Sequence, residues 1–151
     1  MIIHSTRFGP VEVNEKDVLQ FPEGLPGFPE EKVFAFFPYK PDSPFYFLQS
    51  ATDQDLSFLM INPFDFFAGY EFSLDDEQVK QLKISQDVTP EVYCIVTIRG
   101  KIEEMTTNLL APIIINRHQG VALQVILEKS AYTTKHPFIS AQEQKVSEGG
   151  K

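Results

Sequence analysis

The segment from Ile113 to Leu127 reads IIINRHQGVALQVIL and holds two apolar runs separated by a polar loop. The first run is Ile113–Ile115, the second is Val121–Leu127, and residues 116–120 between them read NRHQG. Both runs have the length of strands and are too short for a typical helix, which predicts a pair of strands joined by a loop. Because both sides of each run are apolar, we expect these strands in a closed barrel or between two layers.

The rest of the chain repeats this pattern of short apolar runs between turn signals. Further strands are predicted at Val33–Phe37, Phe45–Leu48, Leu56–Ile61 and Val92–Ile98, with weaker ones at Ile2–Phe8, Val11–Val13 and Val18–Phe21. Pro and Gly separate the runs, and we expect Gly9-Pro10 to turn the chain between the first two strands. Pro26-Gly27, within the sequence EGLPGF at residues 23–28, is typical of the two central residues of a type II turn.

One segment is typical of a helix. Ser73 is its predicted N-cap, and the acidic residues 75–77 complement the positive end of a helix dipole. Leu74, Val79 and Leu82 form one apolar stripe at near-helical spacing. The predicted fold class is therefore mostly β: a small antiparallel β-barrel-like fold with one short helix. We expect a single domain over residues 1–139 and a flexible polar tail over residues 140–151.

The charge of the chain limits its function. Its 151 residues carry a net charge of −8, and residues 1–127 hold nine Lys or Arg against 18 Asp or Glu. This charge repels a phosphate backbone, which excludes direct nucleic-acid binding, and it suits a basic protein partner. A single cysteine, Cys94, excludes an internal disulfide and a multi-cysteine zinc site. No apolar run reaches 18 residues and the N-terminus does not read as a signal peptide, so we expect a cytoplasmic protein without a membrane span.

The sequence offers little for catalysis. It has no phosphate-binding glycine loop and no GxSxG motif, and its cysteine lies within an apolar run, so we predict no enzyme activity, no cofactor and no metal. Two alternatives stay open. The 14 Phe residues allow a barrel that holds one apolar ligand, and a metal-dependent hydrolase would need His4, His118 or His136 to converge with carboxylates.

Two segments are more distinctive than any of these features. Residues 21–28 read FPEGLPGF and residues 104–116 read EMTTNLLAPIIIN. Together with FYFLQS at residues 45–50 and TRFG at residues 6–9, they closely resemble the bacterial flagellar assembly factor FliW family, in order from about Met1 to about Leu127. The resemblance implies a small, mostly antiparallel β-barrel, which agrees with the strands predicted above.

The resemblance also implies a regulator that is not an enzyme. Members of the family bind flagellin in the cytoplasm, and they bind CsrA, a small dimeric RNA-binding protein that represses flagellin translation. A member that is free of flagellin sequesters CsrA, and flagellin that accumulates releases it. We therefore expect CsrA and flagellin as partners, and a monomer when neither is bound.

The candidate protein-binding residues come from the two distinctive segments and from Glu103, directly before the second. They are Glu23, Leu25, Phe28, Glu103, Glu104, Asn108, Leu110, Pro112 and Asn116. Glu103 and Glu104 would present negative charge to a basic partner, and Leu25 and Phe28 would be apolar anchors on a rigid turn. A structural interpretation stays open beside this one: Asn108 would cap a turn, Pro112 would mark a strand edge, and Leu25 and Phe28 would plug one end of the barrel.

Overall fold

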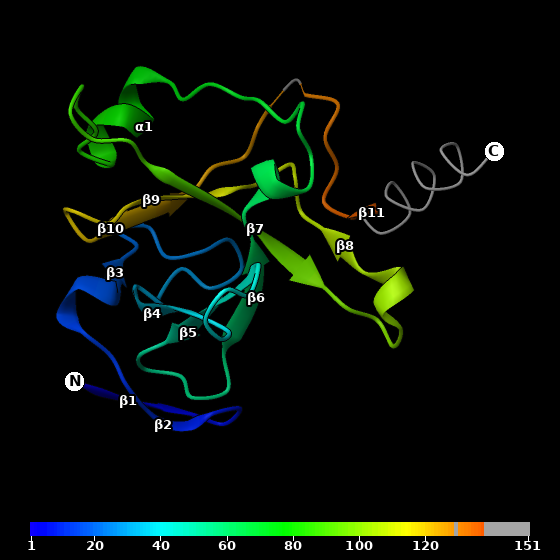
Figure 1. Ribbon diagram of the computed structural model, residues 1–151. Coiled ribbons are helices and arrows are strands. Elements are labelled where there is room, and N and C mark those ends of the chain that lie inside the picture. Colours follow the sequence, from blue (N-terminus) through cyan, green and yellow to red (C-terminus); the bar gives the residue numbers. More distant parts are fainter. Residues whose placement is uncertain (129, 138–151) are drawn as a thin grey trace.

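The computed structural model describes residues 1–128 and 130–137. Seven strands close into a barrel (Figure 1): β3 (Val18–Gln20), β4 (Val33–Pro38), β5 (Phe45–Ser50), β6 (Ser57–Ile61), β7 (Glu91–Thr97), β9 (Ile113–Asn116) and β10 (Val121–Gln124). The remaining elements are β1 (Ile2–Ser5), β2 (Gly9–Glu12), β8 (Thr106–Thr107), β11 (His136–Pro137), three short 3-10 helices η1 (Glu15–Asp17), η2 (Pro63–Asp65) and η3 (Ile102–Glu104), and the helix α1 (Asp76–Gln81). The predicted fold class is confirmed.

Strand pairing closes the barrel through β7. Neighbouring strands follow the order β7-β6-β5-β4-β3-β10-β9, and β9 pairs again with β7 through Val92 and Ile114. All of these pairs are antiparallel except β3 with β10, which run parallel at the pair Gln20 and Val121. The predicted hairpin of β9 and β10 is confirmed, with Val121 opposite Asn116.

Side chains fill the interior of the barrel. Alternate residues of every barrel strand point inward and form one apolar cluster, which includes Leu19, Phe34, Phe36, Leu48, Met60, Tyr93, Ile113, Ile115 and Ala122. Phe21 and Leu25 join this cluster from the loop between β3 and β4, and both are buried. The interior is therefore a packed core, and this packing does not favour the alternative of a ligand held inside the barrel.

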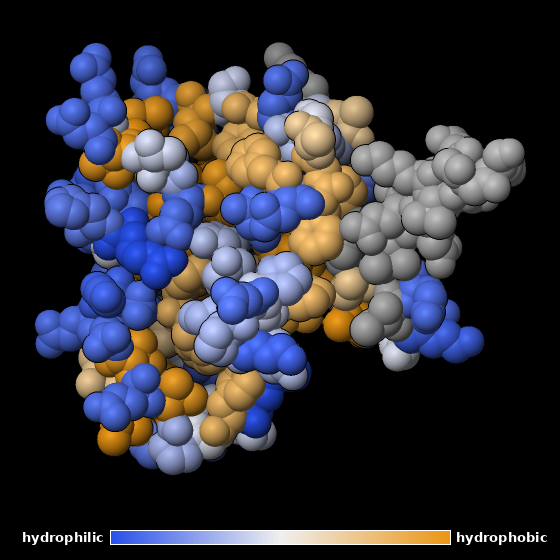
Figure 2. Space-filling model, in the orientation of Figure 1, coloured by the Kyte–Doolittle hydropathy of each residue, from blue (hydrophilic) through white to orange (hydrophobic). Residues whose placement is uncertain are grey.

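A second apolar cluster lies on the outside of β7, β9 and β10. The chain between β6 and β7, which contains η2 and α1, covers this face and contributes Tyr70 and Leu82 to the cluster. The Tyr70 hydroxyl donates a hydrogen bond to the Leu109 carbonyl at 2.7 Å, which ties this cover to the chain before β9. On the face shown in Figure 2, apolar side chains gather over η2 and the chain that follows it.

Helix α1 begins two residues later than the sequence predicts. Asp75 is the N-cap: its carboxylate accepts from the Gln78 N–H at 2.7 Å, and the Gln78 side chain accepts from the Asp75 N–H at 2.9 Å. The prediction of Ser73 as the N-cap was wrong. Asp75 and Gln78 exchange side-chain to backbone hydrogen bonds and so satisfy two backbone N–H groups at the start of the helix, and Ser73 lies two residues before this pair.

The hairpin of β1 and β2 packs against the outside of β4 (Figure 1), where Ile3, Val13 and Ala35 form a third small cluster. The turn of this hairpin lies at residues 6–8, so the prediction of a turn at Gly9-Pro10 was wrong. Both residues belong to β2 instead, because register pairs Gly9 with Ser5 and Pro10 with His4.

Several predicted boundaries differ from those of the structure. Strand β10 ends at Gln124 and not at Leu127, although the chain beyond it keeps backbone hydrogen bonds to the segment before β9. The expected tail over residues 140–151 lies outside the described residues. The helices of the described residues lack the length and hydrophobicity that a membrane-spanning helix requires.

Candidate functional site

The turn between β3 and β4 shapes one end of the barrel. Leu25 and Phe28 exchange two backbone hydrogen bonds, at 2.7 and 3.2 Å, across the pair Pro26-Gly27. Gly27 has a φ of +87°, which a type II turn requires at this position, and the predicted turn is confirmed. Leu25 is 2% exposed and points into the barrel core, whereas Phe28 is 40% exposed. The turn therefore plugs the barrel with one residue and presents the other outward.

Gly24 allows this turn to fold back closely on the chain that follows. Its φ is +66°, and a Cβ placed on it would lie 2.5 Å from the Pro29 carbonyl oxygen and 2.6 Å from that of Phe28. The exposed ring of Phe28 makes an edge contact with Phe58 of β6, with ring centroids 6.0 Å apart. The position of the turn on the barrel end is therefore fixed by backbone contact on one side and by a ring contact on the other.

The segment before β9 reaches the same end of the barrel. The Asn108 N–H donates to the Ile95 carbonyl of β7 at 2.8 Å, and the Asn108 side chain accepts from the Ala111 N–H at 3.0 Å. Asn108 thus holds residues 108–111 in a turn, as the structural interpretation predicts. Leu109 is buried in the outer cluster, and Leu110 is half-buried beside it.

These two segments meet at an apolar groove of about 340 Å³. Its lining comes from both predicted segments, from β6, β7 and the end of β10, from the chain after β10, and from the chain before β11: Leu25, Pro26, Phe58, Ile95, Asn108, Leu110, Ala111, Gln124, Ile126 and Thr134. About 80 residues separate Pro26 from Leu110 in the chain, and strand register brings them together. The groove therefore contains three of the predicted site residues, namely Leu25, Asn108 and Leu110, and Phe28 borders it through Phe58.

The other predicted site residues lie elsewhere. Glu23 is exposed on the same turn segment, outside the groove lining. Glu103 and Glu104 are exposed on the 3-10 helix η3, and they do not line the groove. Pro112 is buried, and its carbonyl accepts from the Val125 N–H at 2.9 Å.

Asn116 is fully buried at the opposite end of β9. Its side-chain amide donates to the carbonyls of Leu82 at 2.8 Å and Lys83 at 3.2 Å, and its side-chain oxygen accepts from the Gln119 N–H at 3.3 Å. These bonds fix the end of α1 against the hairpin of β9 and β10, so Asn116 presents no surface to a partner in this structure.

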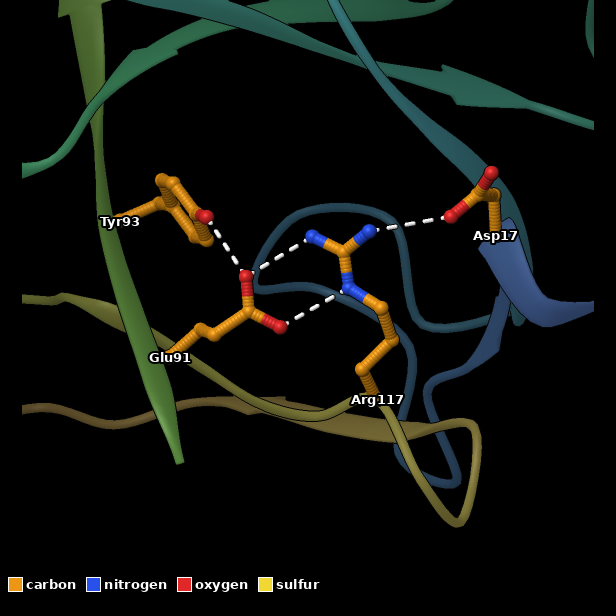
Figure 3. Close-up of polar contacts among 4 residues, drawn as sticks. All are labelled: Asp17, Glu91, Tyr93 and Arg117. Carbon is orange, nitrogen blue, oxygen red and sulfur yellow. Dashed lines mark hydrogen bonds and ion pairs between the residues drawn. The ribbon is translucent and has the colours of Figure 1, made fainter. Parts of the chain in front are cut away.

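An ion network closes the other end of the barrel (Figure 3). The Arg117 guanidinium binds both carboxylate oxygens of Glu91 at 2.8 Å and Asp17 at 3.0 Å, and its carbon lies 4.5 Å from the ring centroid of Phe36. Burial alone would lower the pKa of Arg117, but the hydrogen bonds and charge of Glu91 outweigh it and the pKa rises. Burial and the hydrogen bond to Glu91 raise the pKa of Tyr93. The sequence does not reveal this network, because Asp17, Glu91 and Arg117 are far apart in the chain.

Among the described residues that line the groove, none is a cysteine, a histidine or a charged residue. Cys94 is buried in the outer cluster, and burial raises the pKa of its thiol to about 12. Among the described residues, no group of three or more His, Cys, Asp or Glu side chains is placed to hold a metal ion. The groove presents the apolar side chains of Phe58, Ile95 and Ile126 beside the polar side chains of Asn108 and Gln124. Phe58, Ile95, Ile126 and Gln124 were not among the residues selected from the sequence. This arrangement can bury apolar side chains of another molecule.

Comparison with known proteins assigns the chain to a family. The family model described as FliW protein matches residues 2–139, and the chain therefore belongs to the FliW family. The flagellar assembly factor FliW of Desulfitobacterium hafniense (strain DSM 10664 / DCB-2) is 48% identical over 99% of both chains. That of Bacillus subtilis (strain 168) is 46% identical over 91% of this chain and 96% of its own.

A solved structure shows the same fold. The crystal structure of the flagellar assembly factor FliW superposes with a TM-score of 0.83 at 40% identity, and the match covers 91% of this chain and 96% of that one. This member of the family thus has a closed seven-stranded barrel, and it carries an apolar groove where its two most distinctive sequence segments meet.

Proposed function

We propose that this chain is a cytoplasmic, non-enzymatic regulator that binds the translational repressor CsrA and relieves repression of flagellin mRNA translation. Flagellin is the second partner, and its binding releases CsrA. The family membership supports this role, because relatives at 46–48% identity over nearly the whole chain are flagellar assembly factors. We expect no direct binding of nucleic acid or membrane, and a monomer when no partner is bound.

The observation that carries the proposal is the meeting of residues 25–26 and 108–111 at one apolar groove. Each segment belongs to a different stretch of the family resemblance, and the turn chemistry of Gly24, Gly27 and Asn108 holds both in place. Half-buried and exposed apolar side chains at such a groove are the anchors that protein interfaces use. The net charge of −8 adds long-range attraction for a basic partner.

Glu103 and Glu104 stay a separate proposal within this function. They are exposed on η3 and can present negative charge to CsrA independently of the groove. Replacing both with Lys tests this contribution: weaker CsrA binding supports a contact at η3, and unchanged affinity places the contact elsewhere.

A competition experiment tests the proposed function. CsrA and flagellin from the same genome are purified, a complex of CsrA with this chain is formed, and flagellin is added in increasing amounts before size-exclusion chromatography. We expect flagellin to enter the complex and CsrA to elute free. The proposal fails if the chain binds neither protein, or if flagellin binds and leaves all of the CsrA in place.

A further inference from the structure

We propose that Ile126 is the centre of one composite docking surface for a basic, amphipathic segment of CsrA. The apolar groove takes the apolar side chains of that segment, and an acidic groove on the other side of Ile126 takes its Lys or Arg side chains. This inference rests on the proposed function, because it assumes that CsrA binds at the groove end of the barrel.

The chain that follows β10 forms the ridge between the two grooves. The Val125 N–H donates to the Pro112 carbonyl at 2.9 Å and the Leu127 N–H donates to the Leu110 carbonyl at 2.8 Å. Val125 and Leu127 are buried, whereas Ile126 between them is 56% exposed. Because side chains alternate along an extended segment, Ile126 faces outward with Gln124, and Glu128 beyond it is exposed. Ile126 lines both grooves, so the two form one continuous surface.

The second groove is acidic. It has a volume of about 420 Å³ and lies between the start of α1 and the chain after β10. Glu71, Asp75 and Glu128 line it and are exposed, and among the described residues that line either groove none is Lys or Arg. The surface is thus apolar on one side of Ile126 and negatively charged on the other. This surface favours a partner segment whose apolar side chains meet the apolar groove and whose Lys or Arg side chains meet the acidic groove.

The spacing of the ridge sets the size of the partner segment. The Glu128 N–H donates to the Ile126 carbonyl at 3.1 Å, so the chain turns at Leu127 and the two residues lie closer than the roughly 7 Å of an extended chain. One turn of a helix rises about 5.4 Å, so a helix with an apolar residue and a Lys or Arg one turn apart spans the ridge. A partner with this pattern fills both grooves at once, and its charge fixes its direction along the ridge.

Three variants of the full chain test the composite surface. Ile126→Ala removes the apolar centre, and Glu71→Lys with Glu128→Lys reverses the charge of the acidic groove. Asp75 stays unchanged because it caps α1. The matched control is Glu12→Lys with Glu15→Lys, which changes the net charge equally on exposed residues of β2 and η1, outside both grooves. Affinity for CsrA is measured by titration calorimetry at low and high NaCl, with thermal unfolding to check the fold.

Each variant has a distinct expected result. The charge reversal weakens CsrA binding about tenfold or more at low salt, and it removes most of the salt dependence that the unchanged chain shows. Ile126→Ala weakens binding about tenfold at both salt concentrations, because the lost contact is apolar. The control changes affinity less than about threefold, since long-range attraction alone is altered.

The inference is wrong if folded Ile126→Ala and charge-reversal variants bind CsrA as well as the control does. It is also wrong if these variants lose flagellin binding and keep CsrA binding, which would assign the surface to the other partner. Absence of CsrA binding by the unchanged chain is a different result, because it overturns the proposed function itself.

Discussion

The substitution Gly24→Ala tests how the turn at the groove end is held. Gly24 has a φ of +66°, and an added Cβ would lie 2.5 Å from the Pro29 carbonyl oxygen and 2.6 Å from that of Phe28. Gly27, three residues later, has a φ of +87° but no atom within 4 Å of an added Cβ. Gly27→Ala is therefore a matched control, because it carries the same backbone strain without the overlap.

The two variants should differ by the cost of the overlap. A left-handed φ costs an L-residue about 1–2 kcal/mol, and this is the whole expected loss for Gly27→Ala. Overpacking in a site that cannot yield costs a further 1–3 kcal/mol or so, and backbone carbonyls yield less easily than side chains. We thus expect Gly24→Ala to lose about 2–5 kcal/mol of unfolding free energy.

Urea denaturation at 25 °C measures both losses, and partner binding is measured under conditions where each variant is folded. Because the displaced turn carries Leu25 and Pro26 of the groove wall, Gly24→Ala should also weaken CsrA binding more than Gly27→Ala does. Equal losses of stability in the two variants would refute the close approach that the structure shows.

Three further predictions concern the opposite end of the barrel and the outer cluster. Arg117→Lys should lower the unfolding free energy by about 1–2 kcal/mol in thermal denaturation, because Lys cannot reproduce the two hydrogen bonds to Glu91. The loss stays this small because both side chains are about one-third exposed to solvent. An unchanged melting temperature would contradict this role. Asn116→Asp should cost about 2–4 kcal/mol in urea denaturation near pH 7, because a buried carboxylate would face the Leu82 carbonyl. Burial raises the Cys94 pKa to about 12, whereas an unfolded thiol ionises at about 8.5. Above about pH 9 the unfolded state then binds fewer protons than the folded state, so stability falls as pH rises. Cys94→Ala should remove part of that slope between about pH 9 and 10, and an identical slope would show that the thiol is not the cause.

Much of the fold could be predicted from local sequence. The apolar runs at residues 113–115 and 121–127, separated by NRHQG, predicted the hairpin that closes the barrel, because alternation and run length depend only on neighbouring residues. The turn at Pro26-Gly27 was predicted for the same reason, since φ preferences are local. The N-cap was misplaced by two residues, because Ser73 and Asp75 both suit the position and only the side chain of Gln78 decides between them.

The candidate site was predicted only in part. Leu25, Asn108 and Leu110 were selected from two distant segments, and the structure brings them to one groove. Phe58 and Ile95 were not selected, because they lie on the inward face of β6 and β7 and local sequence does not show that they sit at the open end of the barrel. Ile126 was not selected, because its run was predicted as one strand up to Leu127. Asn116 was selected although it is buried. A polar residue next to a loop is expected at the surface, and the sequence does not show that the carbonyls of Leu82 and Lys83 accept from its side chain.

Hydrogen exchange of this chain with and without CsrA tests most directly where the partner binds. We predict slower exchange at residues 108–111 and 124–128 in the complex, with the amides of the β1–β2 hairpin and those of Phe36 and Phe37 at the opposite end unchanged. Slower exchange confined to that hairpin or to the end that Arg117 closes, with no change at either groove segment, would contradict binding at the groove.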